Sequence, residues 1–174
     1  MFDVAAIGRV PGVTLELAGY RNQAPGFDSR SGEGARRMGG RYNPPHSHPV
    51  VYLCTSRPCV VAELTRQALR QGLTPEAFLP REVWRVTSSL TKVLDLTEPS
   101  ILSELGFSTA DLVRDDVQLT RAIGAGAHEH GFEAIRSPSA TGVDQVVAVM
   151  TDNLGAAVLD TELVEQWTTL ADLA

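Results

Sequence analysis

Hydrophobic and polar positions along the chain predict strands and helices in a mixed order. Residues Thr14–Tyr20 alternate well enough between apolar and polar side chains to form a strand. Short apolar, β-branched runs predict further strands over Pro49–Cys54, Glu82–Thr87, Thr91–Leu96, Phe132–Arg136 and Gln145–Met150. No βαβ unit repeats, so the sequence favours an α+β fold, with a mixed sheet and flanking helices, over a doubly wound α/β fold.

Capping residues and apolar positions at helical spacing predict four helices. Ser56 is a typical N-cap, Pro58 suits a first helical turn, and Gly72 suits the residue after a helix. The expected spans are 56–72, 99–105, 115–131 and 161–173. The last span is predicted from an apolar stripe formed by Leu163, Val164, Trp167 and Leu170.

Length and composition are those of one ordinary domain, which we place at residues 1–174. The chain has 174 residues, of which 43% are hydrophobic and 21% charged, and this composition argues against wholesale disorder. The net charge of −6 makes general nucleic-acid binding unfavourable, because contacts to phosphate dominate that affinity. Residues 1–87 nevertheless carry a net charge of +4, which suits a small anionic ligand.

Several other classes are also disfavoured. No apolar run approaches the roughly 20 residues of a membrane-spanning helix, and the start of the chain lacks the basic and apolar regions of a secretory signal. Cys54 and Cys59 are too few for a disulfide framework or a four-ligand zinc site. His46 and His48 have no third metal ligand nearby. We therefore expect a cytoplasmic protein without a metal or membrane contact.

The segment from Arg21 to Pro49 is rich in Gly, Pro, Asn and Ser, and irregular segments of this length are often functional. Glycines such as Gly40 allow backbone N–H groups to approach an anion closely. Arg41 adds a planar guanidinium suited to phosphate. A surface loop with solvated arginines is the commoner alternative. The spacings of the dinucleotide-binding GxGxxG motif and of Walker A are not met.

Glu63 is a candidate catalytic carboxylate. It follows a buried strand, and its helical neighbours Cys59 and Gln67 form a weakly polar face. The ordinary alternative is a solvated glutamate paired with Arg66 or Arg70. A carboxylate on an inward face could stabilise a developing cation, and such a contact within about 4 Å contributes on the order of 4 kcal/mol.

Three tyrosines and one serine complete the candidates. Tyr20 and Tyr52 lie on expected strands and Tyr42 lies in the glycine-rich segment, so the three suggest a stacking pocket, although core packing is the simpler interpretation. Ser139 follows a proline in a turn, where most serines are turn formers. No G-x-S-x-G motif surrounds it, which excludes a hydrolase nucleophile elbow.

Taken in order, these motifs resemble the RES-domain family, which is named for an arginine, a glutamate and a serine. The similarity extends from about Leu15 to Leu154. The matching pieces are Tyr20-Arg21, Gly34-Ala35, Gly39-Gly40-Arg41-Tyr42-Asn43, Val51-Tyr52-Leu53, Ser56, Ala62-Glu63, Gly131 to Ala140 and Val146 to Val149. Tyr42 stands where the family usually has Trp, and Asn22 stands where some relatives have Tyr.

The resemblance implies a toxin of a type II toxin–antitoxin system, with a fold similar to ADP-ribosyltransferases of the diphtheria-toxin kind. NAD would be its substrate rather than a cofactor, and inorganic phosphate a candidate co-substrate. The implied partner is an Xre-type helix-turn-helix antitoxin that occludes the active site, whereas direct contact with nucleic acid is not expected.

The resemblance also suggests roles for the residues. Glu63 would stabilise an oxocarbenium-like transition state as the nicotinamide–ribose bond breaks. Arg21 and Arg41 would bind the pyrophosphate. Ser139 would contact the ribose or hold a catalytic side chain. The remaining implied substrate-binding residues are Tyr42, Tyr52, Gly40 and Tyr20.

Three outcomes of the chemistry stay open at this point, because phosphorolysis, hydrolysis and ADP-ribosyl transfer to a protein differ only in the acceptor. A non-catalytic binding module on the same fold is a further alternative. The presence of Arg21, Arg41, Glu63 and Ser139 together favours an enzyme.

Overall fold

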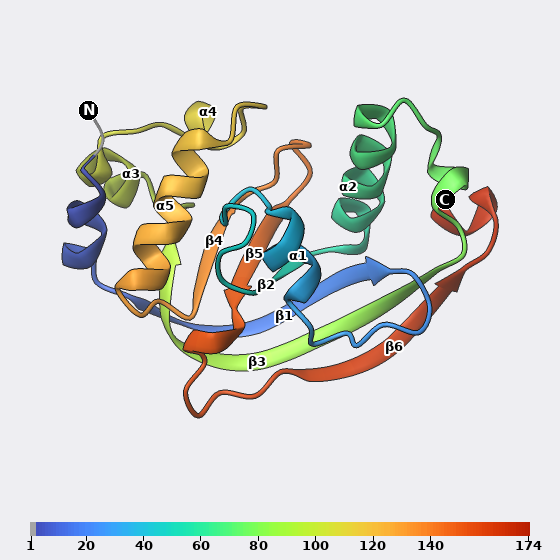
Figure 1. Ribbon diagram of the computed structural model, residues 1–174, viewed down its shortest axis with the longest axis horizontal. Helices are drawn as coiled ribbons and strands as arrows, with labels where there is room; N and C mark the ends of the chain where they lie inside the picture. Colours follow the sequence, from blue (N-terminus) through green and yellow to red (C-terminus); the bar gives the residue numbers. More distant parts are fainter. Residues whose placement is uncertain (1–2) are drawn as a thin grey trace.

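Six strands and five α-helices form the computed structural model, which describes residues 3–174 (Figure 1). The strands are β1 (Val13–Gln23), β2 (Val50–Cys54), β3 (Arg81–Asp95), β4 (Ala134–Pro138), β5 (Gln145–Met150) and β6 (Asp160–Trp167). The helices are α1 (Glu33–Met38), α2 (Arg57–Arg70), α3 (Pro99–Leu105), α4 (Thr109–Leu112) and α5 (Gln118–Glu129). Short 3₁₀ helices cover Val4–Arg9, Pro75–Phe78, Thr151–Asn153 and Leu170–Leu173.

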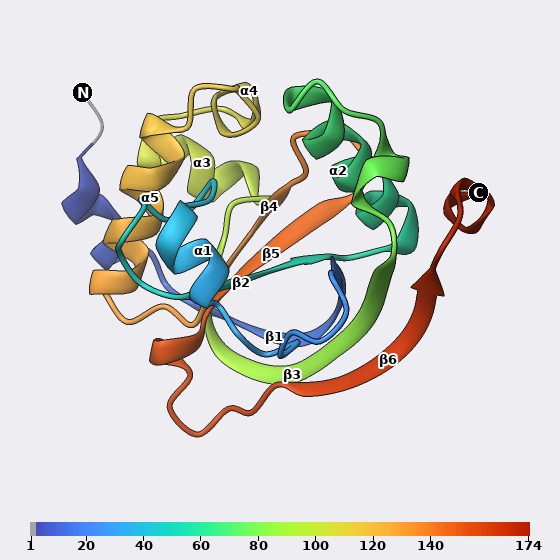
Figure 2. The ribbon, with the colours of Figure 1, turned by 45° about the vertical axis from the view of Figure 1, so that its right-hand side comes forward.

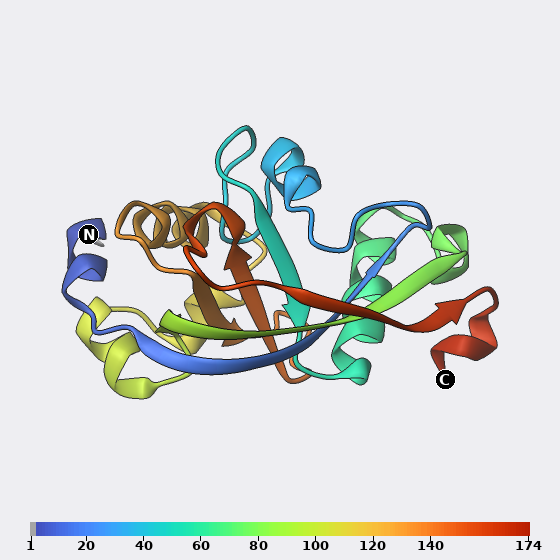
Figure 3. The same ribbon diagram turned by 90° about the horizontal axis from the view of Figure 1, so that it is seen from below.

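The sheet is mixed, as expected for an α+β fold. The pairing of β3 with β4 is parallel, and the other strand pairs are antiparallel. Because β1 pairs with both β2 and β3, the strands β1, β2, β5, β4 and β3 form a closed cycle of neighbours, to which β6 is added beside β3. The long strands β1, β3 and β6 form one curved layer, and β4 and β5 run at a steep angle to it (Figures 1 and 3).

The link between β1 and β2 positions the site. It consists of one residue pair, Tyr20 with Cys54, whereas β1 and β3 pair along most of their length. Strands joined at a single point diverge on either side of it. The two layers therefore separate next to Tyr20, where α2 begins after β2.

Apolar side chains fill the fold on both faces of the central strands. Leu17 of β1 and Val93 of β3 pack with Val147 of β5 between the two layers. On the opposite face α5 places Ile123 against Ile135 of β4. Helices α2 and α5 lie on either side of the upper face, with α1 in front of β2 (Figure 2). Burial of this kind contributes about 25 cal/mol per Å² of apolar surface.

The helix expected over residues 161–173 was a wrong prediction. The chain forms strand β6 along Arg81–Thr87 of β3, followed by the 3₁₀ helix Leu170–Leu173. In this strand Leu163 is 40% exposed and only Trp167 is buried, so the residues of the expected stripe do not share a buried face. Hydrogen bonding to a strand far away in the sequence overrides a local helical pattern.

Smaller differences concern element boundaries. The two strands expected over Glu82–Thr87 and Thr91–Leu96 are one continuous strand, β3, because its polar middle continues the pairing with β1. The segment expected to be irregular contains the short helix α1. Helix α5 begins at Gln118 rather than at Asp115. Within residues 3–174, no helix has the length and apolar character needed to cross a membrane.

Candidate active site

A pocket of about 710 Å³ opens where β1 and β2 diverge, and α2 forms one wall of it. Its lining includes Tyr20, Arg21, Gly40, Arg41, Tyr42, Tyr52 and Glu63, together with Arg66, Gln67, Arg70, Val117 and Arg121. Seven of the eight residues predicted from the sequence therefore line one cavity, and the eighth, Ser139, contacts Glu63 from behind. Among the lining residues in the described range, Glu63 is the only acidic one and five are arginines.

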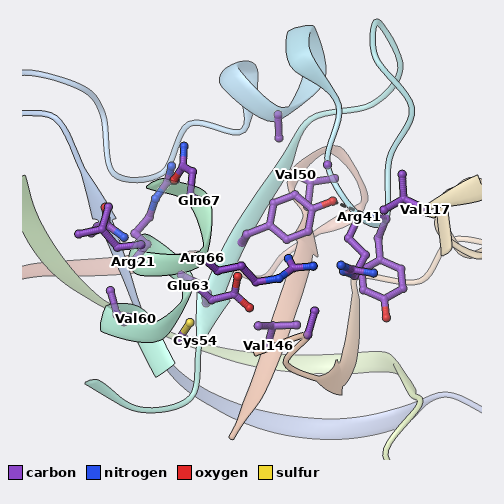
Figure 4. A pocket seen from close by; sticks show the side chains of 18 of the residues that line it. Arg21, Arg41, Val50, Cys54, Val60, Glu63, Arg66, Gln67, Val117 and Val146 are labelled. Atoms are coloured by element: carbon purple, nitrogen blue, oxygen red, sulfur yellow. Dashed lines mark hydrogen bonds between the residues drawn. The ribbon is translucent and has the colours of Figure 1, made fainter. Parts of the chain in front are cut away.

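Helix α2 places Glu63 at the pocket. The helix begins after Ser56, whose Oγ accepts a hydrogen bond from the backbone N–H of Cys59 as an N-cap. The buried face of the helix includes Val60 and Leu64. Glu63 lies at the edge of this face, half-buried, and its carboxylate points into the cavity (Figure 4).

Ser139 holds the carboxylate of Glu63 in place. Its hydroxyl donates a 2.8 Å hydrogen bond to Oε1 of Glu63, and its side chain lies 2.6 Å from the hydroxyl of Thr141. Ser139 is 1% exposed, so its Oγ is a supporting group behind the carboxylate rather than a nucleophile facing the cavity. The structure thus contains a hydrogen bond between Ser139 and a candidate catalytic side chain, which is one of the two contacts expected of this serine.

The guanidinium of Arg21 is anchored on the backbone of the loop after β1. Its Nη1 donates hydrogen bonds of 3.1 Å to the carbonyl oxygens of Ser29 and Ser31. Burial lowers the pKa of Arg21, although the nearby Asp28 acts in the opposite direction. Arginine remains charged despite such a shift, so the guanidinium of Arg21 gives this part of the pocket a positive charge.

Arg41 is anchored on the opposite side of the cavity. Its Nη1 donates to the carbonyl oxygens of Leu112 at 3.0 Å and Arg114 at 2.8 Å, in the chain leading from α4 to α5. Burial lowers the pKa of Arg41, and the positive charge of Arg66 lowers it further. Two guanidinium groups that repel one another in a pocket are stabilised when an anion lies between them.

The glycine-rich segment packs closely on Tyr52. A Cβ atom at Gly40 would lie 2.5 Å from the Tyr52 hydroxyl oxygen, so only glycine fits there without displacing the ring. The hydroxyl donates to Oδ1 of Asn43 at 2.7 Å and accepts from the backbone N–H of Tyr42 at 2.8 Å. Burial raises the pKa of Tyr52, so its hydroxyl remains protonated and serves this hydrogen-bond network.

The three tyrosines differ in exposure. The Tyr42 side chain is 0% exposed and packs in the core cluster around α5, so it supports the pocket wall. Tyr20 and Tyr52 are half-buried and present ring surface at the cavity. In this conformation, stacking on a bound ring is available at Tyr20 and Tyr52 rather than at Tyr42.

Arg66 and Arg121 line the pocket but were not predicted as site residues. Arg66 was considered only as a partner for Glu63, yet its Nη2 lies 2.7 Å from Oδ1 of Asp115. Arg121 donates from Nε to the carbonyl oxygen of Gly40 at 3.0 Å. The signal for Arg66 was its position three residues after Glu63, which places both on one side of α2.

A single carboxylate beside clustered arginines defines the class of this site. Clustered guanidinium groups suit a ligand that carries phosphate groups, and the carboxylate suits positive charge that develops next to it. In residues 3–174, no group of three or more His, Cys, Asp or Glu side chains is arranged to hold a metal ion.

The chain belongs to the RES domain family, whose model matches residues 17–172. It is 36% identical over 130 residues to the NAD(+) phosphorylase MbcT of Mycobacterium tuberculosis and of Mycobacterium bovis, which covers 74% of this chain and 70% of those proteins. The crystal structure of the M. tuberculosis MbcT–MbcA toxin–antitoxin complex contains a similar chain, with a TM-score of 0.79 and 28% identity over 95% of this chain and 91% of that one.

Proposed function

We propose that this protein is the toxin of a toxin–antitoxin pair and that it cleaves the nicotinamide–ribose bond of NAD, with inorganic phosphate as the acceptor. The observation that carries the proposal is the position of Glu63, a carboxylate held by Ser139 on the wall of a pocket whose other charged lining residues are arginines. The similarity to an NAD(+) phosphorylase supports the same reaction.

Glu63 would act on the ribose. Departure of nicotinamide leaves positive charge on the anomeric carbon and ring oxygen, and a carboxylate beside them stabilises that transition state more than the ground state. The hydrogen bond from Ser139 fixes the orientation of the carboxylate before the substrate arrives. Such preorganisation is usually the largest single contribution to catalysis in sites of this kind.

The remaining lining residues would bind the substrate. Arg21 and Arg41 each use Nη1 to hold the backbone, and we assign their free donors to the phosphate groups that the reaction brings into the pocket, those of NAD and of the inorganic acceptor. Tyr20 and Tyr52 would pack against the nicotinamide ring. Gly40 would allow the ligand and the Tyr52 ring to approach the backbone closely.

The partner would be an antitoxin of the Xre helix-turn-helix type that covers the pocket. The similar chain in the MbcT–MbcA complex supports an antitoxin partner. The cytoplasm is the compartment we expect, since Cys54 and Cys59 are both free thiols and the substrate is an intracellular metabolite.

The experiment that tests the function measures NAD loss by the purified protein, freed of any partner, with and without added phosphate. Mass spectrometry should detect nicotinamide together with ADP-ribose 1″-phosphate, and the rate should depend on phosphate. Plain ADP-ribose at a phosphate-independent rate would identify a glycohydrolase. No loss of NAD in either buffer would contradict NAD degradation. Labelling of an acceptor protein would then identify an ADP-ribosyltransferase, and no labelling would indicate a binding module.

A further inference from the structure

The guanidinium groups of Arg21 and Arg41 lie on different sides of Glu63 and have different surroundings (Figure 4). Arg21 lies beside the loop after β1, and the charges that act on it are those of Asp28 and Arg81. Arg41 is acted on by Arg66 and by Glu63 itself. The pocket therefore contains two separate places for an anion, with the carboxylate between them.

The second place is formed by Arg41 and Arg66, whose guanidinium groups extend toward one another from opposite walls (Figure 4). Arg41 binds the carbonyl oxygens of Leu112 and Arg114, and Arg66 binds the carboxylate of Asp115. These acceptors follow one another in a single stretch of chain. Both arginines therefore converge on the same edge of the cavity.

Asp115 is an unusual partner for a pocket arginine. Its side chain is 84% exposed, whereas that of Arg66 is 22% exposed. An exposed ion pair contributes only about 0–1 kcal/mol, so a bound anion can replace this carboxylate at little cost. Asp115 thus holds a position at Arg66 that a phosphate oxygen would otherwise take.

We propose that Arg66, together with Arg41, forms the subsite for the inorganic phosphate that accepts the ADP-ribosyl group, and that Asp115 is an internal anion competing for it. The inference rests on the proposed function. A reaction between NAD and phosphate requires room for the pyrophosphate of one reactant and for the free anion of the other. Arg21 then serves the pyrophosphate, and the shared site of Arg41 and Arg66 places phosphate next to Glu63.

The step balances without another reactant. An oxygen of hydrogen phosphate forms a bond to the anomeric carbon, and the carbon–nitrogen bond breaks with its electron pair moving to the pyridinium nitrogen. Neutral nicotinamide leaves, and the proton of hydrogen phosphate remains on the new phosphate ester until water removes it. The subsite therefore needs only to bind and orient the anion.

The test compares Arg66→Gln with Arg37→Gln, an exposed arginine of α1 that does not line the pocket. Arg66→Gln should raise the KM for phosphate about tenfold or more and leave the KM for NAD within about twofold, because a charge-assisted phosphate contact is lost. Arg21→Gln should instead raise the KM for NAD and leave the KM for phosphate within about twofold. Arg37→Gln should change neither constant.

Asp115→Asn provides a second test, because it should strengthen phosphate binding rather than weaken it. The adjacent Asp116→Asn is its control. Removing the competing charge should lower the KM for phosphate about threefold, while Asp116→Asn should leave it unchanged. Calorimetric titration with inorganic phosphate alone gives the same comparison without turnover, and Arg66→Gln should weaken that binding whether or not NAD is consumed.

The outcomes separate this proposal from the proposed function. Phosphate-dependent NAD loss in the wild type, with a raised KM for NAD in Arg66→Gln and an unchanged KM for phosphate, would assign Arg66 to the pyrophosphate and overturn the subsite alone. Phosphate-independent NAD loss would remove phosphate as the acceptor. If titration then detected no phosphate binding that depends on Arg66, the subsite would be overturned as well.

Discussion

The hydroxyl of Ser139 donates a 2.8 Å hydrogen bond to Oε1 of Glu63, which joins the turn between β4 and β5 to helix α2. The two residues are 76 positions apart in the sequence. Because Ser139 is buried and also contacts Thr141, it restricts the carboxylate to one orientation at the pocket wall. The orientation of the Glu63 carboxylate therefore depends on a residue that is itself buried.

Replacing Ser139 by alanine should lower kcat about 10- to 100-fold with little change in the KM for NAD. The variant keeps the charge of Glu63 but releases its orientation, and a displacement of about 1 Å can cost roughly 100-fold in rate. Steady-state assays of nicotinamide release give both constants. The control Ser89→Ala, on the exposed side of β3, should retain wild-type kinetics. A large rise in KM with normal kcat would instead place Ser139 in substrate binding.

Replacing Glu63 by glutamine should reduce turnover by at least about 100-fold, because the variant loses the charge that we propose stabilises the transition state. Glutamine has nearly the same shape and keeps an oxygen that can accept the hydrogen bond from Ser139. The fold and NAD binding should therefore be retained, as measured by thermal melting and by calorimetry. Wild-type rates in this variant would remove Glu63 from the mechanism.

Much of the fold could be predicted from local sequence signals. Ser56 and Pro58 correctly indicated the start of α2, and the β-branched runs correctly indicated β2, β4 and β5. Strand β6 could not be found in this way, because its pairing with β3 is non-local and the spacing of its apolar residues also fits a helix. Local patterns carry no information about a partner strand elsewhere in the chain.

Only part of the site could be predicted from the sequence. Family motifs brought Arg21, Arg41 and Glu63 together, and all three line the pocket. Arg121 has no distinguishing sequence context among many arginines, and Arg66 has only its helical spacing from Glu63. Their contribution depends on which helix face meets the cavity, and only the packing of α2 and α5 determines that.

Replacing Gly124 by alanine should destabilise the protein by about 3 kcal/mol or more. A Cβ atom there would lie 1.6 Å from the carbonyl oxygen of Tyr42, and neither helix α5 nor that backbone can move aside without disturbing the wall that carries Arg41. Thermal and denaturant unfolding measure the loss. Gly34→Ala is the matched control, because nothing lies within 4 Å of a Cβ at that helical position. It should be neutral or stabilise by up to about 1 kcal/mol.

The ion pair between Asp95 and Arg136 should make stability depend on pH in the acidic range. The two residues are register partners in the parallel pairing of β3 with β4, and Asp95 is 4% exposed. Burial tends to raise the pKa of Asp95, but hydrogen bonds from Arg136 and Thr97 outweigh burial and lower it. The charged pair therefore contributes stability that is fully present above the unfolded pKa of about 3.9. This stability is lost as the pH falls through the lower folded pKa.

Asp95→Asn tests this contribution directly. At neutral pH the variant should lose about 1.5–3 kcal/mol of unfolding free energy, the range for a hydrogen bond to a charged group. The difference from wild type should stay constant above about pH 5 and shrink below about pH 4, where the wild-type carboxylate becomes protonated. Denaturant unfolding at several pH values gives the profile, with the exposed Glu129→Gln as control. A difference that persists unchanged at pH 2 would show that Asp95 acts through packing rather than through its charge.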